Sequence, residues 1–121
     1  MVKAEKEEFA RLMARESGKP VNEARADVIE GLHMAQYVFG RARMPSGEVI
    51  ASEIADKDSY SLRKPKGVVA AITPWNFPFA IPMWLICSAL VEGNTVVFKP
   101  AEETPAVAER AVEFFERVGL P

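Results

Sequence analysis

The most constraining feature of this sequence is a pair of short apolar runs that alternate with helical segments after position 66. Residues 68–73 (VVAAIT) are rich in β-branched side chains and lie between Gly67 and Pro74, a pattern typical of a strand buried on both faces. Residues 95–98 (TVVF) have the same character. The intervening residues 81–92 are apolar nearly all round, which predicts a buried helix with Pro82 in its first turn.

A second helix is predicted after the second run. Thr104 has the character of an N-cap and is followed by Pro105 at the first helical position. The apolar stripe of this helix is predicted to consist of Ala108, Ala111, Val112, Phe115 and Val118.

The order strand, helix, strand, helix predicts the opening of a doubly wound parallel sheet, and hence an α/β fold. Two parallel strands cannot cover the apolar faces of such helices, so the sheet would be incomplete. We therefore expect the 121 residues to be part of a longer protein.

The first 66 residues predict a helical segment followed by an extended arm. Helices are expected over residues 3–17 and 21–39, and Gly18 and Pro20 separate them. Residues 41–58 are polar and predict a loop, whereas 59–64 (SYSLRK) predict an exposed strand or hairpin arm. The predicted apolar stripe of the second helix contains Val21, Ala24, Val28, Leu32, Ala35 and Phe39.

This pattern divides the chain into three parts. They are a helical lead-in (1–40), a loop and arm (41–66), and two strand–helix units (67–121).

Composition excludes several classes of function. Apolar residues make up 49% and charged residues 26%, as in a folded domain, and the net charge of -2 without a basic stripe argues against nucleic-acid binding. Neither a signal peptide nor a run long enough to cross a membrane is evident. The single cysteine, Cys87, cannot form an internal disulfide, so a cytoplasmic location is expected. One cysteine and one histidine make a zinc site improbable.

Two loops are candidates for ligand binding. In open α/β sheets, ligands bind beyond the carboxyl ends of the strands, where residues 74–79 and 99–104 would lie side by side. Asn76 carries an amide that can donate to a developing oxyanion, and Pro74, Trp75 and Pro78 would hold it rigidly.

The second loop carries a lysine and a carboxylate. Lys99 and Glu102 together suit the hydroxyls of a ribose, and the carboxylate would disfavour an added 2′-phosphate, so NAD is favoured over NADP. Simpler roles stay open for each residue taken alone: a cap or loop hydrogen bond for Asn76 and a solvated ion pair for Lys99 and Glu102. Cys87 is interpreted as an inert core thiol, and His33 as a helix-surface or interface residue.

The sequence resembles the aldehyde dehydrogenase superfamily. The resemblance is carried by GVVAAITPWNFPFAIPMW, ALVEGNTVVFKPAEETP and FFERVGLP, and upstream by ESGKPVNEARADV and SLRKPKG, so it covers nearly the whole chain. It implies a Rossmann-like fold of that family's type, in which 41–66 belongs to the oligomerisation arm of a homo-oligomer. It also implies a small-molecule aldehyde as substrate, with no nucleic-acid or membrane partner.

The resemblance implies a role for several residues. Asn76 would help to form the oxyanion hole around a cysteine thiohemiacetal. The nicotinamide side of the cofactor cleft would be lined by Ile72, Thr73, Pro74 and Trp75, and the adenosine ribose would contact Lys99 and Glu102. The family's catalytic cysteine and glutamate have no match here, so we expect them beyond Pro121 and expect this piece to be inactive alone. Cys87 does not match the catalytic cysteine.

Three hypotheses remain open. The first is a fragment of an NAD-dependent aldehyde dehydrogenase. The second is a non-enzymatic module that associates with full-length relatives through its SYSLRK arm. The third is an unrelated nucleotide-binding module, which the absence of GxGxxG and of a P-loop argues against. The aldehyde cannot be identified from the sequence: Phe79 and Trp84 could line an apolar entry, but helix packing explains them equally well.

Overall fold

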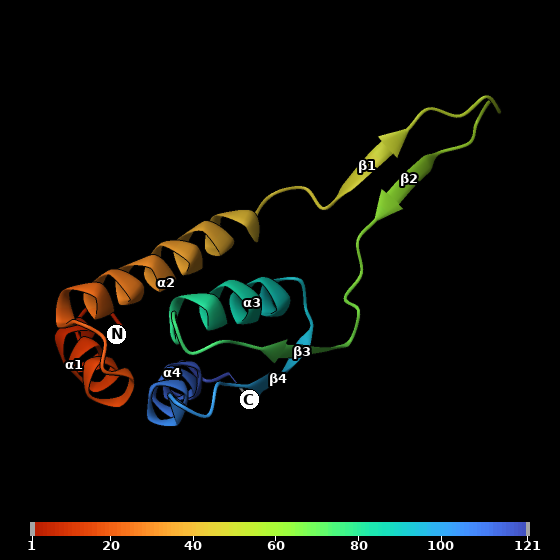
Figure 1. Ribbon diagram of the computed structural model, residues 1–121. Coiled ribbons are helices and arrows are strands. Elements are labelled where there is room, and N and C mark those ends of the chain that lie inside the picture. Colours follow the sequence, from red (N-terminus) through yellow and green to blue (C-terminus); the bar gives the residue numbers. More distant parts are fainter. Residues whose placement is uncertain (1, 121) are drawn as a thin grey trace.

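The computed structural model describes residues 2–120 and shows a helical body from which a hairpin projects (Figure 1). The elements in chain order are α1 (Lys6–Ser17), α2 (Val21–Arg41), β1 (Gly47–Ile50), β2 (Ser59–Leu62), β3 (Val68–Ile72), α3 (Ala80–Val91), β4 (Thr95–Lys99) and α4 (Pro105–Arg117).

Strands β3 and β4 form a parallel pair that α3 connects. Their register places Val68 opposite Thr95 and Ile72 opposite Lys99, which confirms the predicted strand–helix–strand unit. Burial on both faces was a wrong prediction, because Val68, Ile72 and Val97 are 70%, 71% and 62% exposed. The reason is that α3 is the only described helix packed against the pair, so one face stays uncovered.

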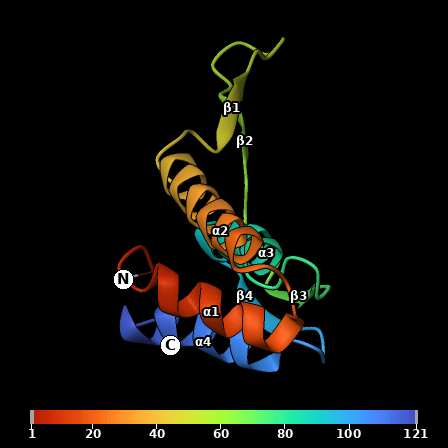
Figure 2. The same ribbon diagram turned by 60° about the vertical axis from the view of Figure 1, so that its left-hand side comes forward.

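The core lies where the helices meet, at the end of the body away from the hairpin. Phe9 of α1 is almost fully buried and packs edge-to-face against Phe79 and Phe114, with ring centroids 4.7 Å and 5.7 Å away. Figure 2 shows α1 lying beside α4, with α2 next to α3. The core cluster comprises Phe9, Ala10, Met13, Ala24, Val28, Phe79, Met83, Val107, Ala111 and Phe114.

Two predicted apolar stripes are partly wrong. On α2, Phe39 is exposed and Val38 is buried instead. On α4, Val112 is exposed, as is Val118 directly after the helix, whereas Val107 and Phe114 are buried. The contact with α1 decides which face of α4 is covered, and apolar side chains on both sides of that face made its position ambiguous from sequence.

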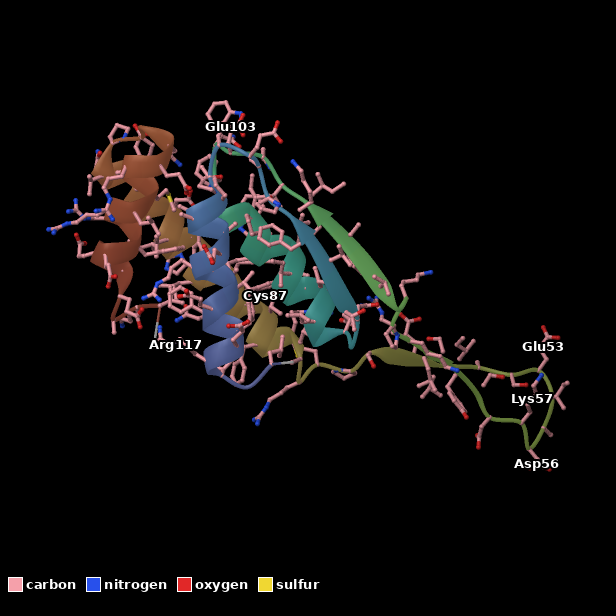
Figure 3. The ribbon with its side chains drawn as sticks, turned by 90° about the horizontal axis from the view of Figure 1, so that it is seen from below. Glu53, Asp56, Lys57, Cys87, Glu103 and Arg117 are labelled. Atoms are coloured by element: carbon pink, nitrogen blue, oxygen red, sulfur yellow. The ribbon has the colours of Figure 1, made fainter. Side chains whose placement is uncertain are left out.

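The arm is a two-stranded antiparallel hairpin. Strand β2 confirms the predicted exposed strand, but the loop prediction for 41–58 is wrong at β1, which pairs with β2 so that Val49 faces Tyr60. Residues 47–50 (GEVI) include two β-branched side chains, but the surrounding stretch is mixed and polar and contains Pro45, which favoured a loop; the backbone partners of β1 come from β2. The hairpin contacts no other described element, and its tip, marked by Glu53, Asp56 and Lys57 in Figure 3, lies far from the helices.

Two further findings concern residues 2–120 only. None of the helices in this range is both long and apolar enough to cross a membrane. The same range contains no group of three or more histidine, cysteine or acidic side chains able to hold a metal ion.

Candidate functional site

The two candidate loops leave the same edge of the parallel pair. The Thr73 N–H donates to the Lys99 carbonyl over 3.2 Å, which extends the strand pairing to the point where both loops begin. The structure thus confirms that the predicted loops 74–79 and 99–104 start side by side at the carboxyl ends of β3 and β4, although Lys99 itself is the last residue of β4. Thr73 is buried at this edge and Ile72 is exposed.

The Asn76 loop is anchored at its end and open in its middle. Pro78 is buried, and Phe79 is 1% exposed in the core, so Phe79 packs helices and does not line an entry. Trp75, Asn76 and Phe77 are exposed. Within residues 2–120, the Asn76 carboxamide makes no hydrogen bond, so its two N–H donors are available to a ligand.

Lys19 fixes the backbone of Asn76 from the turn between α1 and α2. Its Nζ donates to the Asn76 carbonyl oxygen over 2.5 Å and pairs with Asp27 Oδ2 over 3.2 Å. The same ammonium lies 4.6 Å from the centre of the Phe77 ring, within cation–π range. An open hollow of about 550 Å³ lies beside this contact and is lined in part by Lys19, Trp75, Asn76 and Phe77.

Asp27 is a fully buried carboxylate that caps α3. Its Oδ1 accepts from the Ala80 N–H over 2.7 Å, which satisfies one of the helix's free first-turn donors. Burial raises the pKa of Asp27, and the Ala80 and Lys19 hydrogen bonds oppose that rise. Sequence reasoning missed both Lys19 and Asp27. The available signal was an acidic residue within the α2 stripe, three residues after Ala24 and next to Val28.

Lys99 and Glu102 lie together as predicted. Their Nζ and Oε2 atoms are 3.3 Å apart, and the side chains are 59% and 85% exposed. An exposed pair of this kind contributes little to stability, and both groups can reach a ligand.

The start of α4 is capped from a distance. Thr104 occupies the N-cap position, but its side chain makes no capping hydrogen bond. The Glu16 carboxylate, at the end of α1, instead accepts from the Ala106 N–H at 2.7 Å and the Val107 N–H at 2.9 Å. A negative charge at this position also complements the helix dipole. The predicted N-cap position of Thr104 is therefore confirmed, but the expected capping hydrogen bond from its side chain is wrong, because Glu16 is the acceptor.

Cys87 and His33, for which no role in the site was predicted, belong to neither candidate loop. Cys87 is half-buried on α3, and burial raises the pKa of its thiol, which keeps it in the unreactive protonated form. His33 is exposed on α2, as predicted.

The fold and the site together define an α/β protein whose parallel strands end in two polar loops, the usual place for a ligand in this class. A sequence model described as the aldehyde dehydrogenase family matches residues 1–121. The chain belongs to the aldehyde dehydrogenase family.

Its relatives show the same assignment at the level of sequence. The chain is 44% identical over 115 residues to an alpha-ketoglutaric semialdehyde dehydrogenase of Bacillus subtilis, covering 95% of this chain and 24% of that protein. It is 40% identical over 116 residues to a malonate-semialdehyde dehydrogenase of Listeria monocytogenes, covering 96% and 24%. The chain therefore spans about a quarter of the length of these relatives.

Solved structures agree. The betaine aldehyde dehydrogenase of Staphylococcus aureus in complex with NAD+ superimposes with a TM-score of 0.94 at 39% identity, covering 99% of this chain and 24% of that one. An E. coli NADP dependent enzyme gives a TM-score of 0.95 at 36% identity, with coverage of 99% and 25%.

Proposed function

We propose that these residues supply the oxyanion donor and part of the cofactor site of an NAD-dependent aldehyde dehydrogenase that oxidises an aldehyde to a carboxylic acid. The observation that carries this proposal is the Asn76 loop, whose backbone is held by Lys19 while its carboxamide stays free at the edge shared with Lys99. That is the arrangement a preorganised donor needs, because its geometry is set before charge develops.

In this proposal, Asn76 acts on the oxygen of the substrate. A cysteine supplied by the rest of the protein attacks the aldehyde carbon, and the carbonyl oxygen becomes the oxyanion of a thiohemiacetal. The Asn76 N–H groups donate to that oxygen. Bound NAD would supply the hydride acceptor for the same carbon, and a glutamate outside these residues would assist hydrolysis of the resulting thioester.

The dinucleotide is assigned to the second loop and the strand ends. Lys99 and Glu102 would contact the adenosine ribose, and the lining of the nicotinamide side would be Ile72, Thr73, Pro74 and Trp75. The exposed carboxylate of Glu102 favours NAD, because it would repel a 2′-phosphate. The NAD+ complex of the staphylococcal relative supports this choice, whereas the E. coli structural neighbour is described as an NADP dependent enzyme.

The exposed β3–β4 pair supports a larger sheet. Val68, Ile72 and Val97 present an uncovered apolar face, as expected if further strands and helices complete a doubly wound sheet. The activity is accordingly that of a whole protein to which these residues contribute a part.

A graft into a relative tests the proposal. The 115 aligned residues would replace their counterparts in the Bacillus subtilis semialdehyde dehydrogenase, and turnover of its semialdehyde would be measured with NAD and with NADP. We expect an active graft, and we expect Asn76→Ala to lower kcat by about 10²–10³-fold with little change in the KM for NAD. An inactive but folded graft, or an Asn76→Ala graft with full kcat, would contradict the proposal.

A second candidate function, association with other chains, is favoured by the hairpin. Val49 and Tyr60 pair across its strands and are 92% and 66% exposed, and the hairpin contacts no other described helix or strand. An exposed apolar ribbon of this kind fits a docking arm, either in a homo-oligomer or in a module bound to full-length relatives. Sedimentation of the chain alone and mixed with a relative distinguishes these two; a monomer in both cases would contradict association.

A further inference from the structure

Charged side chains at the end of α1 and in the junction after it contact the Asn76 loop and the first turn of α4, which directly follows the second candidate loop. Glu16, the penultimate residue of α1, holds the first turn of α4, and Lys19 holds the Asn76 carbonyl. Asp27, two turns into α2, pairs with Lys19 and caps α3. We refer to Glu16, Lys19 and Asp27 as the brace.

Each contact of the brace acts at or near the position where a loop meets a helix. Ala80 begins α3 directly after the Asn76 loop, and Ala106 and Val107 lie in the first turn of α4 directly after the Lys99–Thr104 loop. The brace therefore sets where each loop finishes, while the β3–β4 pairing sets where each begins.

The residues at the starts of α3 and α4 do not cap these helices themselves. Phe79 and Thr104 occupy the two N-cap positions and make no side-chain capping bond. Glu16 is half-buried, the Lys19 side chain is 14% exposed and that of Asp27 is 0% exposed. Charged groups that are withdrawn from water in this way need their partners, so this arrangement is specified and not incidental.

We propose that the brace residues are positioning residues. Lys19, together with Asp27, orients the Asn76 carboxamide that donates to the oxyanion, and Glu16 orients the Lys99–Glu102 pair. The inference rests on the proposed function. The hydrogen bond from Lys19 fixes the peptide plane at Asn76. Removing the ammonium therefore leaves the carboxamide chemically intact but less precisely positioned. A small misplacement of a catalytic group is enough to lower the rate substantially.

Loss of Lys19 and loss of Glu16 should have different kinetic effects in the graft. Lys19→Met keeps most of the aliphatic stem and removes the ammonium; we expect kcat to fall about 10- to 100-fold with the KM for NAD changed less than about twofold. Glu16→Gln should raise the KM for NAD about fivefold while kcat at saturating NAD stays within about twofold. Lys3→Met and Glu109→Gln, at exposed positions, are the matched controls and should leave both constants unchanged.

A double-mutant cycle separates positioning from a purely structural role. If Lys19 acts through the Asn76 amide, then Lys19→Met should lower kcat in the wild-type graft but have almost no further effect in the Asn76→Ala graft. Lys19→Arg, which keeps a cation, should restore most of the lost rate. Independent, multiplicative losses in the cycle would overturn the proposal, and so would an unchanged kcat in Lys19→Met.

A double variant keeps the test decisive if Lys19→Met folds poorly. Lys19→Met leaves the buried Asp27 without its cation, so Lys19→Met/Asp27→Asn removes both charges and retains the side-chain carbonyl acceptor for Ala80. It should show the same kcat loss per folded molecule. Failure of Asn76→Ala to lower kcat contradicts the proposed function, whereas failure of the brace variants alone contradicts only this inference.

Discussion

At the scale of single residues, the most informative positions are those where a charged or small side chain meets a distant part of the chain. The rigid surroundings of Asn76 predict a positioned amide donor, but the side chain that holds its backbone carbonyl, Lys19, lies 57 positions earlier. Gly31 is another such position, because it lets α2 approach the Phe79 ring.

Gly31→Ala should destabilise the chain. An added Cβ would lie 2.5 Å and 2.6 Å from Phe79 ring atoms and 3.2 Å from Met83 Cγ, and Phe79 is wedged in the core and cannot move aside. Overpacking costs about 1–3 kcal/mol, which outweighs the helix gain from alanine. The measurement is the free energy of unfolding in urea.

Gly40→Ala is the matched control for that substitution. Gly40 lies in the same helix and a Cβ there would meet no atom within 4 Å. Alanine should therefore stabilise the chain by about 0.5–1 kcal/mol. Equal effects at the two glycines would show that α2 and α3 do not pack as closely as described.

At the scale of elements, α1 joins the two strand–helix units. Its Phe9 contacts Phe79, the residue before α3, and Phe114 of α4, and its Glu16 caps α4. The α1 helix is therefore a central packing element of these units, although its sequence alone marks it only as an amphipathic helix.

Phe9→Leu should weaken this junction. Leucine keeps most of the apolar volume but loses two edge-to-face ring contacts, each of which contributes about 0.5–1.5 kcal/mol. We expect the free energy of unfolding to fall by about 1–3 kcal/mol. Phe39→Leu, at a ring that is 71% exposed, should change it by less than about 0.5 kcal/mol; a comparable loss at both positions would contradict the assigned core.

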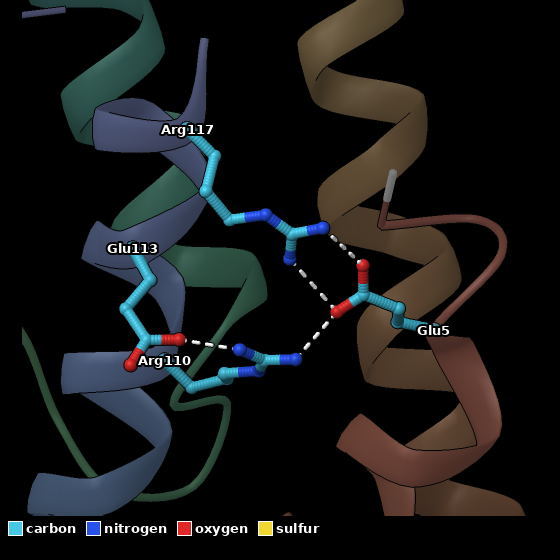
Figure 4. A network of polar contacts seen from close by, with 4 residues as sticks. All are labelled: Glu5, Arg110, Glu113 and Arg117. Atoms are coloured by element: carbon cyan, nitrogen blue, oxygen red, sulfur yellow. Dashed lines mark hydrogen bonds and ion pairs between the residues drawn. The ribbon is translucent and has the colours of Figure 1, made fainter. Parts of the chain in front are cut away.

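At the scale of the whole molecule, a charged cluster ties the start of the described chain to its last helix. Figure 4 shows Glu5 between Arg110 and Arg117, with Glu113 bound to Arg110. The Arg117 hydrogen bonds to the Glu5 carboxylate are 3.0 Å and 2.8 Å long. Glu5 and its two arginine partners are more than 100 positions apart in sequence, so these contacts form only when the chain has folded.

The cluster predicts a pH dependence of stability. The Arg117 hydrogen bond lowers the pKa of Glu5 below its ordinary value. A lowered pKa stabilises the folded state above the unfolded-state pKa of glutamate, about 4.3, and this contribution is lost as the pH falls through the folded-state pKa.

Glu5→Gln should accordingly lower the urea midpoint of unfolding near pH 7. The difference in midpoint between this variant and the wild type should shrink as the pH is lowered toward about 3. Glu30→Gln, at an exposed position of α2, controls for the loss of a carboxylate. Urea titrations at a series of pH values between these limits give the comparison. A deficit that stays constant across the series would show that the Glu5 pairing does not contribute.

The four helices, the parallel β3–β4 pair and the two loops at its carboxyl edge were predictable from sequence alone, because they follow from local periodicity, turn residues and the handedness of β-α-β connections. The covered helix faces, strand β1 and the brace were decided by tertiary structure. Each of these depends on a partner outside its own segment, such as Glu16 for the α4 amides and Asp27 for Ala80. Local patterns carry no information about which distant group will supply a hydrogen bond or cover a face.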